Sequence, residues 1–480
     1  MKLNRIMIAA PKSGSGKTTI TCAVLQALKN RKERVVSFKC GPDYIDPMFH
    51  RKVIEIPSKN LDTFFVGEDT VRELLLKGRT EQEIAVMEGV MGLYDGLGGV
   101  REEGASYHLA KVTKTPIILV VDAKGMGKSV IPLIAGFLAY DTEHLIKGVL
   151  LNRMSKSYFD IISPLIEEEL KIKVVGYFPE YKNFSLESRH LGLRMPEEYE
   201  DIKGKLAELT SQFEKTVSVD EIWQIAKTAE TLDVKSDFCI AENSTGSLDE
   251  NSITVLKDEK SNLLENKQKP VLAVAKDEAF CFYYEDNLLL LEEAGVELKY
   301  FSPLHDKEIP QGCHGLLLGG GYPELYAGEL SDNVTMRNSV KEAVMSGMPT
   351  VAECGGFMYL HSELVDQEGI THKMADVLSG KCFYTGKLVR FGYIELSENL
   401  CVSTPWEIGG KTIKAHEFHY FDSEENGTGF VACKPTTGRT YPCIVTTKSL
   451  FCGFPHLYYP SNKDFVKTFV SKIEEYRDKR

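Results

Sequence analysis

Short apolar segments alternate with helical stretches through the first half of this 480-residue chain. The apolar segments have the length of buried strands, and the stretches between them are long enough for helices. They occupy residues 6–10, 35–39, 84–88, 117–122, 148–152 and 173–178. Alternation of this kind is typical of βαβ units, so the pattern predicts an α/β fold with a parallel sheet in this half.

A polar and charged interval at 236–268 interrupts the apolar pattern. A second α/β series begins beyond it with the apolar segment 270–275 and continues through 297–301, 315–318 and 350–352. A chain of this length can bury more than one apolar core. The pattern therefore predicts two domains, at 1–235 and 269–480, joined by a linker at 236–268.

The amino-acid composition limits the classes of molecule that we expect this protein to bind. A formal net charge of -12 argues against a general nucleic-acid binder and against a membrane-surface binder, because both need a basic face. The first apolar segment is too short for the core of a signal peptide, and no apolar run approaches the length of a membrane span. Eleven cysteines without close paired spacing indicate reduced thiols. We therefore expect a cytoplasmic protein with no nucleic-acid and no membrane partner.

A glycine-rich loop between the first predicted strand and the first predicted helix has the composition of a phosphate-binding loop. In this setting successive backbone N–H groups and the helix N-terminus can cradle the phosphates of a nucleotide. Lys17 would neutralise the β- and γ-phosphate oxygens, and the Thr18 hydroxyl would bind Mg2+. The predicted nucleotide-binding residues are Gly14, Ser15, Gly16, Lys17, Thr18 and Thr19. A similar stretch at 124–129 has Asp122 where the first glycine belongs, and we assign no nucleotide to it.

Acidic residues follow two of the predicted strands, at the edge where parallel sheets bind their ligands. Asp43 and Asp46 come after the strand at 35–39, and Glu88 ends the strand at 84–88. Carboxylates are suitable Mg2+ ligands, but acidic residues near Gly and Pro also cap turns, and spacing alone leaves both roles open. We assign Thr18, Asp46 and Glu88 to Mg2+, and we place Asp43 and Tyr44 on the side of the substrate and the phosphate.

Cys354 lies between an apolar strand and a glycine-rich stretch. A tight strand-to-helix turn there would expose its sulfur, and the helix N-terminus would lower the pKa of the thiol. Another glycine-rich loop follows the apolar segment 315–318, where unobstructed backbone N–H groups could stabilise a tetrahedral oxyanion. Gly320 and Gly321 are the candidates for this oxyanion hole.

Two histidines three residues apart, His416 and His419, resemble a pair of metal ligands. The short apolar alternation around them favours a strand, in which a spacing of three directs side chains to opposite faces. We therefore assign no metal to this pair.

Several motifs resemble, in their order, the cobyrinic acid a,c-diamide synthase family. In the first half they lie at 9–19, 38–47, 60–62, 88–92 and 187–193, and motifs around Cys354 and His456 extend the similarity over nearly the full chain. The phosphate-binding loop has Pro11 in place of its usual first glycine, as in dethiobiotin synthetase-like ATPases. The resemblance implies an N-terminal, dethiobiotin synthetase-like P-loop domain and a C-terminal class I glutaminase-like α/β domain.

The same resemblance implies the catalytic roles in the second half. Cys354 would be the nucleophile, and His456 would accept the thiol proton and later protonate departing ammonia. The family requires no acidic third member. It often has a second histidine where Tyr458 stands in this chain.

The implied activity is an amidating ligase of cobalamin biosynthesis. ATP, with Mg2+, would activate the a and c carboxylates of cobyrinate or hydrogenobyrinate as acyl phosphates, and ammonia from glutamine would displace the phosphate. The implied partners are small molecules, namely a cobyrinate-type tetrapyrrole, glutamine and ATP, and a homodimer is possible.

Two alternatives stay open. One is amidation of a sirohydrochlorin-type tetrapyrrole, or cobyric acid synthesis at other side chains, although the run Gly41-Pro42-Asp43-Tyr44-Ile45-Asp46 favours the a,c activity over the latter. The other is a partition-type or regulatory P-loop ATPase with an inactive glutaminase-like domain. The presence of both Cys354 and His456 argues against a role without catalysis.

Overall fold

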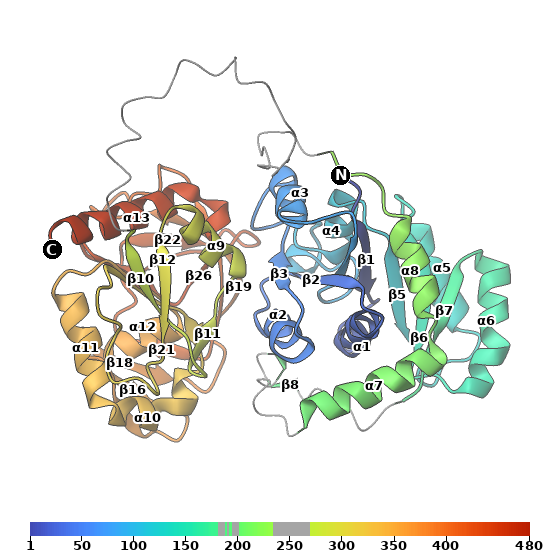
Figure 1. The fold of residues 1–480 in the computed structure, drawn as a ribbon, viewed down its shortest axis with the longest axis horizontal. Helices are drawn as coiled ribbons and strands as arrows, with labels where there is room; N and C mark the ends of the chain where they lie inside the picture. Colours follow the sequence, from blue (N-terminus) through green and yellow to red (C-terminus); the bar gives the residue numbers. More distant parts are fainter. Residues whose placement is uncertain (181–187, 190–191, 194–200, 234–268) are drawn as a thin grey trace, which may run out of the picture.

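The computed structural model describes residues 1–180, 188–189, 192–193, 201–233 and 269–480. These residues form two α/β bodies that lie side by side, one from each half of the sequence (Figure 1). The predicted linker at 236–268 lies outside the described residues, and so do parts of the motif at 187–193. The domain boundaries therefore stay predictions. Within the described residues, no helix is both long and apolar enough to cross a membrane.

The first body is built on a seven-stranded sheet in which all neighbouring strands run parallel. In sheet order the strands are β3 (Ser58–Leu61), β2 (Arg34–Cys40), β4 (Glu83–Glu88), β1 (Asn4–Ala9), β5 (Ile117–Asp122), β6 (Ile146–Asn152) and β7 (Lys173–Phe178). Six of them confirm the strands predicted from the apolar segments. The seventh, β3, is a four-residue edge strand with the sequence Ser-Lys-Asn-Leu, which carries no apolar run that could have predicted it.

Helices cover both faces of this sheet. Successive residues of its central strand, which point to opposite faces, are therefore buried. In β1, Ile6 and Ile8 belong to one apolar core, whereas Met7 and Ala9 belong to the other. The helices are α1 (Lys17–Asn30), α2 (Ile45–Phe49), α3 (Glu68–Leu76), α4 (Ser106–Val112), α5 (Val130–Tyr140), α6 (Lys156–Leu170), α7 (Ile202–Thr216) and α8 (Val219–Lys227). Shorter elements are a π-helical turn (His50–Ile54), a 3-10 turn (Leu97–Gly99) and the paired strands β8 (Ser188–Arg189) and β9 (Gly192–Leu193).

The second body also has a parallel sheet at its centre. In sheet order its strands are β12 (Glu297–Phe301), β10 (Val271–Ala275), β13 (Gly315–Leu318), β15 (Thr350–Glu353), β25 (Leu450–Gly453) and an antiparallel edge strand, β24 (Val445–Thr446). Its helices are α9 (Glu285–Glu293), α10 (Ala327–Asp332), α11 (Val334–Met345), α12 (Gly355–Leu360) and α13 (Lys463–Asp478), with 3-10 turns at Pro323–Tyr326 and Tyr459–Ser461. The chain is therefore an α/β protein with a parallel sheet in each half.

Smaller antiparallel sheets surround the second parallel sheet. One contains β23 (Thr440–Cys443), β22 (Phe430–Cys433), β19 (Arg390–Glu398), β20 (Ile413–His419) and β26 (His456–Leu457). Another contains β17 (Thr371–Lys373), β16 (His361–Val365), β18 (Leu378–Tyr384) and β21 (Phe421–Ser423), within which β16 and β18 run parallel. A short pair joins β11 (Phe280–Phe282) to β14 (Gly320–Gly321). Strand β20 confirms that His416 and His419 lie on a strand.

Aromatic side chains from the two bodies pack against each other. Phe65 stacks on Tyr458 with ring centroids 4.9 Å apart and an interplanar angle of 13°. Phe64 approaches Tyr393 at 4.5 Å between ring centroids. Contacts between buried rings exclude water, so they fix the relative position of the two bodies.

Polar contacts accompany these rings. The Lys59 ammonium donates to Asp286 Oδ1 at 2.8 Å, and the Tyr458 hydroxyl donates to Asp286 Oδ2 at 3.2 Å. The Tyr393 hydroxyl donates to Asp62 Oδ2 at 2.6 Å. Because Asp286 is buried, the Lys59 ammonium of the first body provides a countercharge that solvent does not supply there.

Removal of that cation should destabilise the protein. We expect Lys59→Met to lower the free energy of unfolding by about 3 kcal/mol, because it leaves the Asp286 carboxylate buried without a countercharge. The double variant Lys59→Met/Asp286→Leu should recover most of the loss, since it removes both charges. The midpoint of thermal unfolding measures both effects, and a double variant as unstable as the single one would contradict this account.

Candidate active sites

The predicted phosphate-binding loop connects β1 to α1 at the carboxyl edge of the first sheet. Gly14 and Gly16 have φ angles of 75° and 89°, a region that glycine adopts readily. A Cβ atom on Gly16 would lie 2.3 Å from Asn152 Nδ2, so this position has no room for a side chain. The Asn152 amide holds the loop from β6 by donating to Ser15 O at 2.8 Å. Sequence reasoning missed Asn152, whose only signal is its place at the end of a predicted strand.

Lys17 lies folded back over this loop. Its ammonium donates to the carbonyl oxygen of Met91 and, at 3.5 Å, to that of Lys12. Burial, followed by repulsion from Lys39, lowers the pKa of Lys17 to about 8. Carbonyl dipoles compensate a cation only in part, so an anionic phosphate near this ammonium would restore its pKa and bind strongly.

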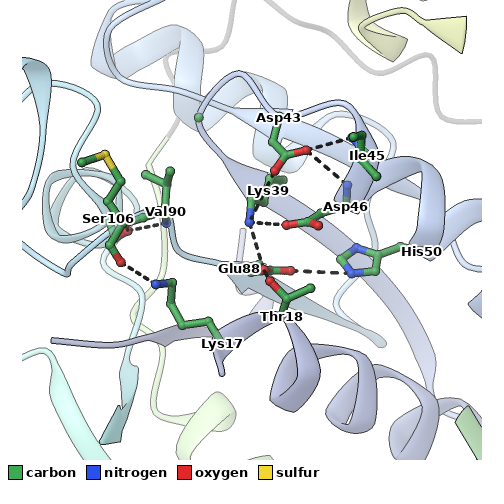
Figure 2. A network of polar contacts seen from close by, with 12 residues as sticks. Lys17, Thr18, Lys39, Asp43, Ile45, Asp46, His50, Glu88, Val90 and Ser106 are labelled. Atoms are coloured by element: carbon green, nitrogen blue, oxygen red, sulfur yellow. Dashed lines mark hydrogen bonds and ion pairs between the residues drawn. The ribbon is translucent and has the colours of Figure 1, made fainter. Parts of the chain in front are cut away.

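A buried ion cluster occupies the ends of β2 and β4. The Lys39 ammonium donates to Glu88 Oε1 at 2.9 Å and also pairs with Asp46 (Figure 2). The Thr18 hydroxyl, from the start of α1, donates to the same Glu88 oxygen at 2.6 Å. Lys39 and Glu88 are partners in the register of the two parallel strands, so the sheet itself brings them together. The structure thus gathers the three predicted Mg2+ ligands, Thr18, Asp46 and Glu88, around Lys39.

The carboxylates of this cluster have different affinities for protons. Burial, followed by repulsion from Asp46, raises the pKa of Glu88 to about 7. Burial would also raise the pKa of Asp46, but the adjacent Lys39 ammonium lowers it below its ordinary value. Asp43 has its pKa raised to about 6 by burial and by Asp46. Its Oδ1 accepts from the backbone N–H groups of Ile45 and Asp46, so Asp43 caps the turn as well as facing the cluster.

Sequence reasoning missed two members of the cluster. Lys39 is a charged residue inside an apolar strand, and His50 follows Asp46 at the i, i+4 spacing that shares one helix face; both patterns were available as signals. His50 Nε2 lies 3.7 Å from Glu88 Oε2, and neither atom has a hydrogen-bond partner in the described structure. Burial lowers the pKa of His50 to about 4, so the imidazole is neutral at physiological pH.

One position in the cluster, beside Thr18 and Glu88, is suited to a hard divalent cation. Thr18 and Glu88 offer adjacent oxygens, and Glu88 Oε2 is buried without a partner. Asp46 is engaged by Lys39. No group of three His, Cys, Asp or Glu side chains with the arrangement of a metal site occurs among the described residues. The oxygens of Thr18 and Glu88 therefore fit Mg2+. Asp46, which is paired with Lys39, would lie behind that ammonium and would not bind the ion directly.

Cys354 occupies a tight turn between β15 and α12, as the sequence predicted. Its backbone angles are φ 47° and ψ -104°, outside the regions that residues with a Cβ atom ordinarily adopt. The turn needs small neighbours, because a Cβ atom on Gly356 would lie 2.2 Å from the carbonyl oxygen of Leu318. The backbone thus presents the sulfur as a nucleophile elbow does.

Cys354 and His456 line the same cavity, whose volume is about 810 Å³. Both predicted oxyanion-hole glycines lie beside them. A Cβ atom on Gly320 would be 2.4 Å from His456 Cε1, and one on Gly355 would be 3.1 Å from the backbone nitrogen of Gly321. Other residues that line the cavity include Phe282, Tyr322, Glu324, Tyr384, Phe418 and His419.

Burial determines the electrostatics of this cavity. It lowers the pKa of His456 to about 3, with a smaller contribution from His419, so the imidazole is neutral and able to accept a proton. Burial, followed by the charge of Glu324, raises the pKa of the Cys354 thiol above its usual range. The backbone N–H of Gly355, at the N-terminus of the helix, lowers this pKa as expected, but it does not offset the desolvation of the thiolate.

The two histidines of β20 are hydrogen-bonded to other parts of the second body. His416 Nδ1 is hydrogen-bonded to the Tyr284 hydroxyl at 3.0 Å, and His419 Nδ1 donates to Phe421 O at 2.7 Å. Glu417, fully buried between them, accepts from the Tyr441 hydroxyl.

Comparison with protein families divides the chain in the same way as the two bodies. Residues 6–193 match the family described as CobQ/CobB/MinD/ParA nucleotide binding domain. Residues 271–462 match the family described as CobB/CobQ-like glutamine amidotransferase domain.

Similar curated proteins span almost the whole chain. Cobyrinate a,c-diamide synthase of Caldanaerobacter subterraneus subsp. tengcongensis is 37% identical over 473 residues, which cover 98% of either chain. The Clostridium acetobutylicum protein of that name is 37% identical over 478 residues, covering 98% of this chain and 100% of its own. The protein of that name from Picrophilus torridus is 34% identical over 471 residues, covering 98% and 99%.

These relatives span both bodies, so they account for a nucleotide-binding domain and a glutamine amidotransferase domain in the same polypeptide. The chain belongs to the cobyrinate a,c-diamide synthase family of glutamine-dependent amidating ligases.

Proposed function

We propose that this protein uses ATP and glutamine to amidate the a and c carboxylates of cobyrinate or hydrogenobyrinate in cobalamin biosynthesis. The observation that carries the proposal is the contact between the two sites. The Tyr44 ring lies 5.4 Å from the His456 ring, between centroids, and Asp43 and Asp46 flank Tyr44 in the sequence. Ammonia released beside His456 would thus emerge close to the turn that borders the ion cluster.

In the synthetase half, the backbone of the loop and Lys17 would hold the phosphates of ATP. Mg2+, bound through Thr18 and Glu88, would supply charge neutralisation at the phosphate oxygens. A substrate carboxylate oxygen bonds to the γ-phosphorus as the bond to the ADP oxygen breaks. Asp43 would face the substrate, and Lys39 would keep Asp46 ionised next to it. Ammonia then attacks the acyl carbon, phosphate leaves, and the amide nitrogen loses a proton to solvent or to a nearby carboxylate.

In the glutaminase half, His456 would take the thiol proton while Cys354 Sγ attacks the amide carbon of glutamine. The backbone N–H groups of Gly320 and Gly321 would stabilise the oxyanion of the tetrahedral intermediate. The imidazolium then protonates the departing ammonia, and water hydrolyses the thioester to release glutamate. The raised pKa of the thiol makes this proton transfer part of the attack.

The two alternatives receive unequal support. A sirohydrochlorin-type substrate, or the side chains that cobyric acid synthesis modifies, would use the same ion cluster, so product analysis must decide among them. A regulatory ATPase with an inactive appendage has no use for the strained turn at Cys354 or for a neutral base in the same cavity. The homodimer stays a prediction.

Cys354→Ser tests the division of labour. We expect it to reduce glutamine-supported synthesis by at least about 10³-fold and to leave ammonium-supported synthesis within about twofold, because only thioester formation needs the sulfur. The assay is mass spectrometry of cobyrinate after incubation with ATP and either nitrogen source, in which two amidations per macrocycle identify the a,c product. Equal loss with both sources would contradict separate sites.

Lys17→Ala tests the other half. It should reduce synthesis with glutamine and with ammonium alike, by at least about 10²-fold, because the γ-phosphate charge is left uncompensated. Lys128→Ala, in the similar glycine-rich stretch at 124–129, removes an exposed lysine and serves as the matched control with unchanged rates. Glutamine hydrolysis should survive in both variants. A Lys17→Ala enzyme that still amidates with ammonium would show that another cation binds the phosphate.

Glu88→Ala separates a metal role from a substrate role. If Glu88 binds Mg2+, its loss should raise the Mg2+ concentration needed for half-maximal ammonium-supported synthesis, and excess Mg2+ should restore part of the rate. Titration of the rate with Mg2+ at saturating cobyrinate measures this. An unchanged Mg2+ requirement together with a higher KM for cobyrinate would move Glu88 to the substrate side.

A further inference from the structure

Within the part of the chain that the structure describes, no carboxylate forms a hydrogen bond or an ion pair with His456. Its Nδ1 atom is buried and has no hydrogen-bond partner among the described residues. Tyr458, two residues further along, does not fill the role, because its hydroxyl donates to Asp286. Histidine bases that serve a nucleophile are commonly held by a third group, so some other interaction must fix this imidazole.

One face of the imidazole is covered by His416. The two rings stack with centroids 4.9 Å apart at 18°, and the two residues are register partners in β20 and β26. His416 is itself held by its hydrogen bond to the Tyr284 hydroxyl, at 3.0 Å. Both rings of this contact belong to the second body.

Tyr44 supplies a further large ring, and it comes from the first body. Its ring centroid lies 5.4 Å from that of His456 and 5.7 Å from that of His416. The ring also stacks on Phe282, 5.0 Å away at an angle of 6°, and Phe282 lines the cavity with Cys354. Only 8% of Tyr44 is exposed, so the ring fills the space behind the cavity wall rather than a solvent cleft.

The backbone that carries Tyr44 is fixed by the synthetase half. Gly41 has a φ angle of 88°, and the Asn60 side chain donates to Gly41 O at 2.9 Å and to Asp43 O at 2.7 Å. On the other side of Tyr44, Asp46 pairs with the buried Lys39. The ring is therefore preorganised by contacts that lie within the first body.

We propose that Tyr44 is a positioning residue of the glutaminase, completing from the synthetase half an aromatic enclosure that holds the His456 imidazole in place of a carboxylate. The inference rests on the glutaminase role proposed for Cys354 and His456. Aromatic contacts on the imidazole restrict its rotation and exclude water from its unpartnered nitrogen. A shift of about 1 Å in a catalytic group can reduce a rate 100-fold, so the loss of one wall of the enclosure should be measurable.

The test is glutamine hydrolysis by the full chain without ATP or tetrapyrrole. Tyr44→Leu should lower kcat between about 10-fold and 100-fold with a change of less than about twofold in KM for glutamine, because the base moves while the cavity stays. Tyr44→Met, which keeps the bulk without a ring, should show the same loss. Tyr44→Phe, which keeps the ring, should recover most of the rate. Thermal unfolding of each variant shows whether it is folded, and the Met variant carries the test if the Leu variant is not.

Phe64→Leu is the matched control. Phe64 is another buried ring of the first body at the same interface, but it packs on Tyr393 and has no ring contact with His456 or His416 among the described residues. We expect glutamine hydrolysis by this variant to stay within about twofold of the unmodified protein. An equal fall in the Phe64 and Tyr44 variants, or an unchanged kcat in Tyr44→Leu, would overturn the inference. Failure to amidate cobyrinate would count only against the proposed substrate, because the hydrolysis assay contains none.

Discussion

The buried ammonium of Lys39 is the interaction on which the synthetase half depends. Asp46 and Glu88 are almost fully buried, and two uncompensated carboxylates at that depth would be strongly destabilising. Burial alone would lower the pKa of Lys39, but Asp46 and Glu88 raise it well above its ordinary value. Because the strand register places Lys39 opposite Glu88, the charge balance is a property of the sheet. The carboxyl edge can therefore carry acidic groups in a dry environment without unfolding.

The turn that follows this strand connects the chemistry of one half to the geometry of the other. Its carboxylates face Lys39, whereas its aromatic ring points across the interface to the imidazole of His456. A single rigid segment therefore borders both reaction centres. This segment can border both sites only if the position of one body relative to the other is fixed. The contacts Phe65–Tyr458 and Lys59–Asp286 between the two bodies fix it.

The regular part of this organisation could be predicted from the sequence. Apolar segments identify strands that are buried on both faces. Glycines between a strand and a helix identify a phosphate loop, because glycine adopts the positive φ angles of that loop more readily than other residues do. Strand β3 escaped prediction because an edge strand with the sequence Ser-Lys-Asn-Leu has no apolar run. The contact of Tyr44 with His456 escaped it because it depends on packing between segments far apart in the chain. The helix N-terminus lowers the pKa of Cys354 as predicted, but the larger rise caused by burial of the thiol could not be judged without its surroundings.

The backbone at Cys354 also places catalysis and stability in opposition. Glycine adopts positive φ angles without the steric cost that a Cβ atom incurs, so a change to glycine at this position would relieve backbone strain and would also remove the sulfur. A population of random variants selected for thermal resistance alone would thus accumulate glycine here. The role proposed for Cys354 would make selection for turnover act in the opposite direction.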